Sequence, residues 1–304
     1  MPKINGDTVC SLQNRLRYFI QCIRDHSKGS SHPIKIIAPE LNGDLSELWL
    51  TPTRVLCNAF WRSVDYRFVG SSIGAPLHFL DLGCGAGVYG EIFKRHSGDA
   101  FGSYTGLDIY LDPAFPKQYQ HILARAEDAV SHLDKDVNLV ISQSALEHIE
   151  HDLIVVRSLT ARFVRQKKSF MQIHLVPGAS SLWLYLWHGW RQYSKRRLSQ
   201  WGFELKNEFD ANIAVVPIGG IRCFAVHFIC VTLPVYGGIL LSYVLPPRLV
   251  GGRSKNRVVL PTLRRCAVSG SVGSGSSPVF WAFIVSSKNI DPTKLFANAA
   301  VSWG

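Results

Sequence analysis

The feature that most constrains this chain is an apolar run that ends in a glycine-rich loop, LHFLDLGCGAGVYG at residues 77–90. The run predicts a buried strand, and residues 86–95 predict the helix that follows it. Glycines between a strand and a helix let the backbone approach a bound nucleotide closely. Two glycine spacings fit the loop, Gly83–Gly85–Gly87 and Gly85–Gly87–Gly90, and the second matches the G-x-G-x-x-G of dinucleotide-binding folds.

Short apolar runs alternate with helical stretches through the middle of the chain, which predicts a parallel sheet covered by helices on both faces. The runs lie at 77–83, 103–110, within 121–128, and at 137–144 and 169–177, with two more at 202–205 and 278–288. The predicted fold class is therefore α/β: a Rossmann-like, doubly wound, mostly parallel seven-stranded sheet with a hydrophobic and basic insertion between its last two strands. Ligands of such sheets bind beyond the carboxyl ends of the strands.

Carboxylates stand where a nucleoside would be held. Asp81 ends the first run, two residues before Gly83, where its charge would repel a pyrophosphate but favour a ligand carrying an ammonium and a sulfonium. Asp108 ends the second run and can accept hydrogen bonds from ribose hydroxyls, as acids in NAD sites also do. Glu127 and Asp128 follow the third run, where an adenine amino group would lie.

Four motifs in this order resemble the class I S-adenosylmethionine-dependent methyltransferases: D-x-G-x-G-x-G, an acid ending the second strand, A-E-D after the third, and S-x-x-x-L-E-H-I after the fourth. The resemblance covers residues 77–177 and implies S-adenosylmethionine as the cofactor. By this resemblance, the backbone of Gly83, Cys84, Gly85 and Gly87 approaches the donor's methionine end, and Asp81 binds its ammonium group through water. Asp108 binds the ribose hydroxyls, and Asp128 binds the adenine amino group. Ala126 and Glu127 line the adenine ring, and Ser142 and Gln143 border the donor. Gly90 is expected to allow close packing of the helix against the sheet.

Four parts of the chain follow from these patterns. Residues 1–76 form an N-terminal helical and irregular extension, with a helix at 8–26 and irregular structure at 30–75, and residues 77–210 form an S-adenosylmethionine-binding methyltransferase core. Residues 211–277 form an apolar and basic insertion that acts as an acceptor lid or as a membrane-associating element. Residues 278–304 contain the last strand and a tail.

Residues that act on the methyl acceptor should lie beyond the fourth and fifth strands. Methyl transfer is an in-line displacement, and a hydroxyl or amine acceptor must also lose a proton. His148 and His174 are the candidate catalytic bases, although lone histidines are often structural. The candidate acceptor-side residues are Trp187, His188, Arg191 and Tyr193. No Cys/His spacing and no oxygen-ligand cluster in the sequence predicts a metal site.

Tryptophans recur at helical spacing just before a basic stretch. Trp183, Trp187 and Trp190 predict one helical stripe, which would suit a sugar, a nucleobase or an anionic interface. The alternative is a stripe that covers the sheet as core.

The second half of the chain is strongly basic. Residues 1–150 contain 14 Lys/Arg and 17 Asp/Glu, whereas residues 151–304 contain 19 and 5. This imbalance suggests an anionic partner such as a lipid surface or nucleic acid, or a solvated basic face. The absence of Cys/His metal spacings among seven cysteines indicates reduced thiols, and the N-terminus lacks an apolar signal segment, so we expect a cytoplasmic protein.

Residues 224–245 of the insertion carry no Lys, Arg, Asp or Glu, and a basic cluster follows them. Three structures fit: a buried helical hairpin over the acceptor site, an interfacial element that dips into a membrane, and a true span interrupted by Pro234, Gly237 and Gly238. The basic cluster would suit acidic lipid headgroups and would allow association with a membrane surface.

The leading functional hypothesis is methyl transfer to a hydroxyl or amine of a small-molecule, sugar or lipid-linked acceptor. The alternatives are a nucleic-acid (RNA) methyltransferase, a non-catalytic methyltransferase-like binding module, and an NAD oxidoreductase. SQSALEHI replaces the N-P-P-Y-like segment of nucleic-acid enzymes, which by resemblance favours a small-molecule acceptor.

Overall fold

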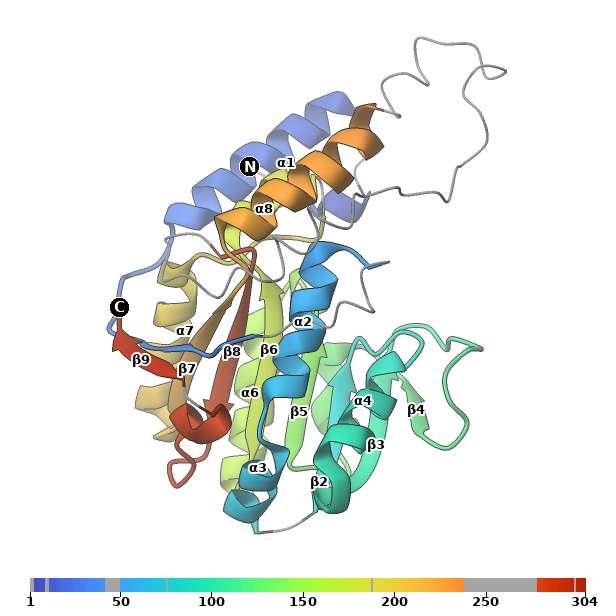
Figure 1. The fold of residues 1–304 in the computed structure, drawn as a ribbon, viewed down its shortest axis with the longest axis vertical. Coiled ribbons are helices and arrows are strands. Elements are labelled where there is room, and N and C mark those ends of the chain that lie inside the picture. Colours follow the sequence, from blue (N-terminus) through green and yellow to red (C-terminus); the bar gives the residue numbers. More distant parts are fainter. Residues whose placement is uncertain are drawn as a thin grey trace.

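The computed structural model describes residues 3–8, 11–41, 50–74, 76–186, 188–237, 278–297 and 299–304. Its described strands form one nine-stranded sheet in the order β4-β3-β2-β5-β6-β8-β7-β1-β9 (Figure 1). Their bounds are β1 Lys35–Ala38, β2 Leu77–Leu82, β3 Phe101–Asp108, β4 Gln120–Leu123, β5 Leu139–Gln143, β6 Met171–Pro177, β7 Asn212–Ile218, β8 Phe280–Ser286 and β9 Ala300–Trp303.

Strand directions confirm the predicted doubly wound, mostly parallel sheet. Neighbouring strands are parallel in the pairs β2–β3, β3–β4, β2–β5, β5–β6 and β1–β7. They are antiparallel in the pairs β6–β8, β7–β8 and β1–β9. The strand order reverses between β2 and β5, which is where open α/β sheets bind ligands.

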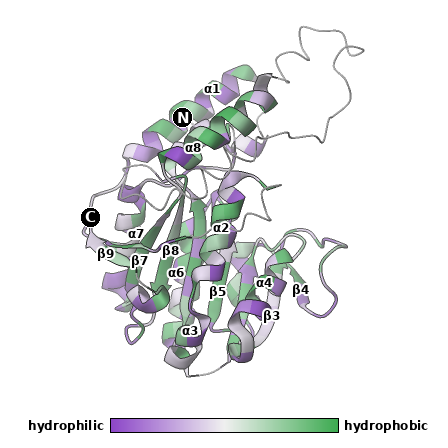
Figure 2. Cartoon of the chain, viewed as in Figure 1, coloured by the Kyte–Doolittle hydropathy of each residue, from purple (hydrophilic) through white to green (hydrophobic). Residues whose placement is uncertain are grey.

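Helices cover both faces of the sheet. Their bounds are α1 Leu12–Ser27, α2 Pro52–Ser63, α3 Tyr66–Ile73, α4 Val88–Ser97, α5 Ala129–His132, α6 Asp152–Arg165, α7 Lys195–Phe209 and α8 Ile221–His227. One apolar core contains residues of α2, α3 and α4, and the other contains residues of α5, α6 and α7. Successive residues of β2 enter the two cores, Phe79 the first and Leu80 the second, and Figure 2 shows mainly hydrophobic residues along β5, β7 and β8.

The sheet has nine strands rather than the predicted seven, because β1 and β9 extend it beyond β7. Residues 30–75, expected to be irregular, contain β1, α2 and α3. β1 is only four residues long and is held by parallel pairing with β7 and antiparallel pairing with β9. Pairing with distant segments leaves no local signal in so short a strand. The Thr51 cap and Pro52 in the first turn of α2 are local helix-start signals that we missed.

The strand predicted at 202–205 is wrong, since these residues lie within α7. Leu198, Trp201 and Leu205 are buried at helical spacing, whereas Phe203 is 46% exposed. The strand before the insertion is β7, which lies inside the range 211–277 that we assigned to the insertion. The segment between the last two core strands therefore begins after Ile218, and its position between β7 and β8 agrees with the predicted fold class.

The apolar segment 224–245 is described only as far as residue 237. It continues α8 through a π-helical turn, Phe228–Thr232, and a helical segment at 233–237. Residues 238–245, with the basic cluster and the linker up to residue 277, lie outside the described residues. Among the helices that are described, none combines the length and apolar character needed to cross a membrane.

Candidate active site

Two adjoining cavities open at the carboxyl ends of the parallel strands. The larger, about 670 Å³, is lined by residues that follow β2, β3, β4 and β5, including Gly83, Asp108, Ala126, Glu127 and Ala145. The smaller, about 360 Å³, is lined by residues such as Thr53, Cys57, Glu147, Tyr185 and Phe280. Ser144 and His148 line both cavities, so the two spaces meet at these residues. We call the larger the donor cavity and the smaller the acceptor cavity, after the roles proposed for them below.

The glycine loop borders the donor cavity with a left-handed backbone. Gly83, Gly85 and Gly87 have φ angles of +71°, +50° and +66°, which L-residues with a side chain rarely adopt. A Cβ on Gly87 would lie 2.6 Å from the ring of Phe115, so this ring covers the start of α4. Gly90 is close to Tyr119 and Tyr104, which confirms its packing role.

Asp108 ties the glycine loop to the end of β3. One carboxylate oxygen accepts a hydrogen bond from the Gly85 backbone N–H at 2.9 Å, and the other accepts from the Tyr110 N–H at 3.2 Å. The carboxylate also lines the donor cavity, in the position predicted for a ribose contact. The same residue therefore orders the loop and faces the ligand space.

Asp81 does not line the donor cavity, although its position in the sequence suggested a contact through water. Its carboxylate is 3% exposed and accepts a 2.6 Å hydrogen bond from the buried Tyr104 hydroxyl. Burial raises the pKa of Asp81 to about 7, against the smaller lowering effect of the Tyr104 hydrogen bond. Burial also raises the pKa of the Cys84 thiol well above its usual value, so Cys84 acts as a small buried filler in the loop.

The raised pKa of Asp81 has a consequence for stability. A folded-state pKa above the unfolded value means that the carboxyl binds its proton more tightly in the folded chain, so its contribution to stability is lost as pH rises toward about 7. We expect Asp81→Asn to be more stable than the wild type, with a gap that widens by roughly 2–3 kcal/mol between about pH 5 and about pH 8. Urea unfolding at the two pH values measures this gap. Asp128→Asn, which removes an exposed carboxylate, is the control variant.

The other predicted donor residues divide between positions inside and outside the donor cavity. Ala126 and Glu127 line it, whereas Asp128 is exposed and is not among its lining residues. Ser142 is fully buried and bonds to His174, so it does not reach the ligand space. Gln143 lines the acceptor cavity instead, and its side-chain oxygen accepts a 2.6 Å hydrogen bond from the Trp61 indole.

The donor cavity is rich in carboxylates. Four of them line it, from Asp7, Asp108, Glu127 and Glu150. The cationic Arg125 also lines it, and its guanidinium is 2.9 Å from a Glu127 oxygen, so the charges of this pair offset each other and three carboxylates remain. An excess of negative charge favours a cationic ligand and disfavours a diphosphate. Sequence reasoning missed Asp7, which lies in a short helical turn, Gly6–Thr8, outside the motifs.

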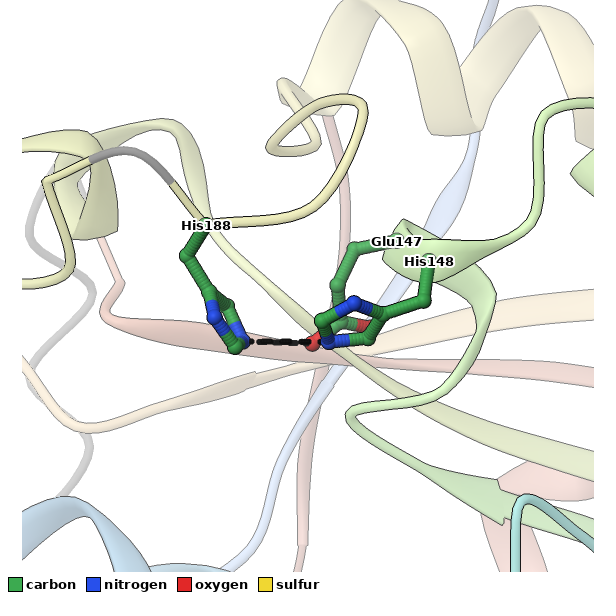
Figure 3. Close-up of side chains that lie close together, drawn as sticks. All are labelled: Glu147, His148 and His188. Carbon is green, nitrogen blue, oxygen red and sulfur yellow. Dashed lines mark hydrogen bonds and ion pairs between the residues drawn. The ribbon is translucent and has the colours of Figure 1, made fainter. Parts of the chain in front are cut away.

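A cluster of titratable groups stands where the cavities meet. The Nε2 atoms of His148 and His188 are 3.2 Å apart, and His188 Nε2 is 3.8 Å from a Glu147 oxygen (Figure 3). Asp7 accepts a 2.5 Å hydrogen bond from His148 Nδ1. Burial opposes the charge on His148, but the Asp7 hydrogen bond and the charges of Glu147 and Asp7 outweigh it and raise the His148 pKa. Burial and then the charge of His148 lower the pKa of His188.

Glu147 is the most unusual member of this cluster. Its side chain is fully buried, and neither carboxylate oxygen has a hydrogen-bond partner among the described residues. Burial raises its pKa to about 7. Sequence reasoning missed this residue, although an acid directly before a candidate base in LEHI was a usable signal. The sequence predicted no metal site, whereas the structure brings three possible ligand atoms, from Glu147, His148 and His188, within 4.8 Å of one another.

His174 lies inside the protein and not in the acceptor cavity. It is 0% exposed in β6, with Nδ1 2.9 Å from the Ser142 hydroxyl and Nε2 3.2 Å from the Gln172 side-chain oxygen. Gln172 in turn bonds to Thr160 of α6, so this polar group is packed between the sheet and α6. Burial lowers the pKa of His174 to about 3, which does not suit a base near neutral pH.

Two of the predicted acceptor-side residues are structural. Arg191 and Tyr193 are buried, and both bind the carboxylate of Asp152, at 2.6 Å and 2.7 Å. His188, by contrast, lines the acceptor cavity as predicted. Trp187 lies outside the described residues. The predicted tryptophan helix is wrong: a short 3₁₀ turn ends at Trp183, which is 54% exposed, and residues 184–186 and 188–194 contain no helix.

No protein-family model matches the chain, and no curated protein matches it. Solved structures similar to it include the plantazolicin methyltransferase BamL in complex with a triazolic desmethylPZN analog and SAH (13% identity over 77% of this chain and 85% of that chain, TM-score 0.44). A second is a SAM-dependent methyltransferase from Archaeoglobus fulgidus (17% identity over 77% of this chain and 94% of that chain, TM-score 0.44). A third is the YcgJ protein from Bacillus subtilis (12% identity over 73% of this chain and 97% of that chain, TM-score 0.39).

The topology of the sheet and the placement of the glycine loop after β2 give the chain the Rossmann-like fold that its resemblance to class I methyltransferases implied. One such fold supports many reactions, so its chemistry has to be inferred from the residues of the site.

Proposed function

We propose that this protein transfers a methyl group from S-adenosylmethionine to a hydroxyl or amine of a small-molecule, sugar or lipid-linked acceptor. The observation that carries the proposal is the meeting of an acid-lined donor cavity with a second cavity at Ser144 and His148. Volumes of about 670 Å³ and 360 Å³ are in the range of small-ligand sites. Two adjoining sites are what a two-substrate transfer needs.

The donor would lie along the ends of β2, β3 and β4. Asp108 would accept hydrogen bonds from the ribose hydroxyls, and Glu127 and Ala126 would border the adenine. The cationic methionine end would lie near Gly83 and Ala145, with the methyl group facing the junction. The carboxylates of this cavity would stabilise the positive charge of the sulfonium donor.

The chemical step would take place at the junction of the cavities. The acceptor's lone pair forms a bond to the methyl carbon while the carbon–sulfur bond breaks, and its electron pair leaves with the sulfur as a neutral thioether. The acceptor's proton must go to a nearby group, and His148 is the residue of the cluster that lines both cavities. Of the two histidines considered from the sequence, only His148 has this position.

An apolar acceptor is supported by the elements above the acceptor cavity. The helix from Ile221 to residue 237 packs through the buried His227 against Tyr185, which lines the acceptor cavity. Ile221, Ile229 and Leu233 of the same helix are 50–76% exposed. Leu12, Leu16 and Ile23 of α1 are also exposed, at the same end of the molecule (Figure 1). Exposed apolar side chains on helices suit contact with a lipid surface or a lipid-linked acceptor.

Calorimetry with S-adenosylmethionine and with NAD tests the donor, and an acceptor search tests the reaction. In the search, aqueous and lipid extracts are treated with enzyme and donor and examined for a mass gain of one methyl group in place of a hydrogen. A methylated lipid would support the lipid-linked acceptor. Binding of NAD without binding of S-adenosylmethionine would overturn the proposal.

Asp108→Ala is expected to weaken donor binding by about 10- to 150-fold, because hydrogen bonds between a charged group and the ligand, worth about 1.5–3 kcal/mol, are lost. Calorimetric dissociation constants for S-adenosylmethionine measure the effect. Asp128→Ala is the matched control, since the exposed Asp128 is outside the donor cavity. Equal donor affinity of Asp108→Ala and the wild type would contradict the assignment.

A further inference from the structure

The cluster of Glu147, His148 and His188 has a composition that differs from a simple hydrogen-bonded network. It offers two imidazole nitrogens and one carboxylate, all within 4.8 Å, from two separate segments of the chain (Figure 3). The side chains of His148 and His188 are 35% and 39% exposed at the cavity, whereas that of Glu147 is 1% exposed behind them. The cluster therefore has a buried carboxylate on one side and is open to the cavity on the other.

Glu147 has no hydrogen-bond partner that would compensate its burial. A buried carboxylate normally accepts several hydrogen bonds or neutralises a cation, because removing its charge from water costs several kcal/mol. Within the described residues both of its oxygens lack a hydrogen-bond partner, and the nearest complementary group is His188 Nε2 at 3.8 Å. A cation between the carboxylate and the imidazoles would supply the missing partner.

The spacing of the ligand atoms suits such a cation. A metal ion bonds to nitrogen and oxygen ligands at about 2.0–2.2 Å. With ligand–metal–ligand angles of roughly 100–130°, two ligand atoms on one ion are about 3.2–3.9 Å apart. The observed separations are 3.2 Å between the two Nε2 atoms and 3.8 Å between His188 Nε2 and Glu147 Oε1. Two of the three separations are thus those of ligands that share one ion, and the third, between His148 and Glu147, is within 4.8 Å.

Asp7 orients the histidines from outside the cluster. Its carboxylate binds His148 Nδ1 at 2.5 Å and is 3.7 Å from His188 Nδ1. A proton held on Nδ1 leaves the lone pair of a neutral imidazole on Nε2, directed at the centre of the cluster. Metal-binding histidines commonly have such a carboxylate on the other ring nitrogen.

We propose that Glu147, His148 and His188 bind one divalent first-row transition-metal ion, such as Zn²⁺ or Co²⁺, with Asp7 as a positioning residue. Two imidazoles and one carboxylate are a common ligand set for these ions, and three protein ligands leave a coordination position open. The open position faces the acceptor cavity. This role rests on the proposed function: the ion would bind the acceptor oxygen and favour its deprotonation, and His148 would then be a ligand and not the base.

Metal binding can be measured apart from methyl transfer. We expect the untagged full-length protein to bind one equivalent of Zn²⁺ by calorimetry, and one equivalent of Co²⁺ with the visible absorption of a four- or five-coordinate ion. Glu147→Gln and His188→Ala should each abolish the Co²⁺ spectrum. Asp7→Asn should weaken affinity by about 10- to 100-fold and retain the spectrum, as for the loss of an orienting carboxylate.

His132→Ala is the control, because His132 is exposed at the end of α5, outside the cluster, and both metal affinity and spectrum should be unchanged. Binding that is absent, or that persists in both Glu147→Gln and His188→Ala, would overturn the inference. Should Glu147→Gln fail to fold, His188→Ala decides, since its partly exposed ring is not part of the core. S-adenosylmethionine binding without stoichiometric metal would overturn this inference alone, whereas metal binding without donor binding would overturn the proposed function alone.

Discussion

Replacing His148 by alanine is expected to lower the rate of methyl transfer by about 10²–10⁴-fold, which is the usual contribution of a group that removes the acceptor's proton, whether it does so directly as the base or as a ligand of the ion that favours deprotonation. His148 lines both cavities, and its Nδ1 is held by Asp7 at 2.5 Å. The loss should fall on kcat, because the main donor contacts proposed for Asp108 and Glu127 are retained. The measurement is the initial rate on the acceptor found by the mass-gain search, together with the dissociation constant of S-adenosylmethionine.

His132→Ala provides the comparison, since it removes an exposed imidazole outside both cavities and should leave the rate unchanged. A rate for His148→Ala within about threefold of the wild type would remove His148 from the reaction. A parallel loss of donor affinity and rate would instead indicate that His148 mainly shapes the donor cavity.

Arg191→Ala is expected to lower the free energy of unfolding by about 3–5 kcal/mol, the usual cost of leaving one partner of a buried ion pair alone. The side chains of Arg191 and Asp152 are 5% and 4% exposed, and their closest nitrogen and oxygen are 2.6 Å apart. Arg191 also donates to the carbonyl oxygens of Ile149 and Glu150, at 3.0 Å and 2.7 Å. Arg197, at 3.6 Å, would remain as the second cation near Asp152. Urea unfolding of the wild type and the variant measures the difference.

Arg157→Ala is the matched control for this loss. Arg157 pairs with Glu208 at 2.7 Å, but the two side chains are 54% and 37% exposed, so removal should cost less than about 1 kcal/mol. Equal effects of the two substitutions would show that the Asp152 network is not a structural anchor, and would return Arg191 to the acceptor-side candidates.

The donor half of the site could be predicted because its information is local. The glycine loop follows β2 directly, and Asp108 ends the neighbouring strand, so parallel pairing brings the two together. Sequence reasoning erred where the depth of a residue matters. It placed Asp81 in the ligand space, although Asp81 is buried against Tyr104, and it preferred Asp128 to Glu127. Which of two adjacent acids faces a cavity depends on a backbone rotation that the spacing does not reveal.

The acceptor half could be predicted only in part. His148 and His188 were recognised as candidates, but Arg191 and Tyr193 were not recognised as partners of Asp152. A basic and aromatic stretch gives the same pattern whether its side chains point into a cavity or into the core. The 202–205 strand failed for a related reason, because a four-residue apolar run fits a strand as well as it fits one turn of a helix.

The sequence by itself determined the class of fold and the position of the glycine loop after β2, because strand–loop–helix units are encoded by residues that are neighbours in the chain. Only the tertiary structure decided the chemistry at the junction of the cavities. Asp7 meets His148 across 141 positions and His148 meets His188 across 40, and both contacts form only when the N-terminal extension and the segment after β6 pack over the ends of the strands. No spacing in the chain records contacts that depend on how distant segments pack.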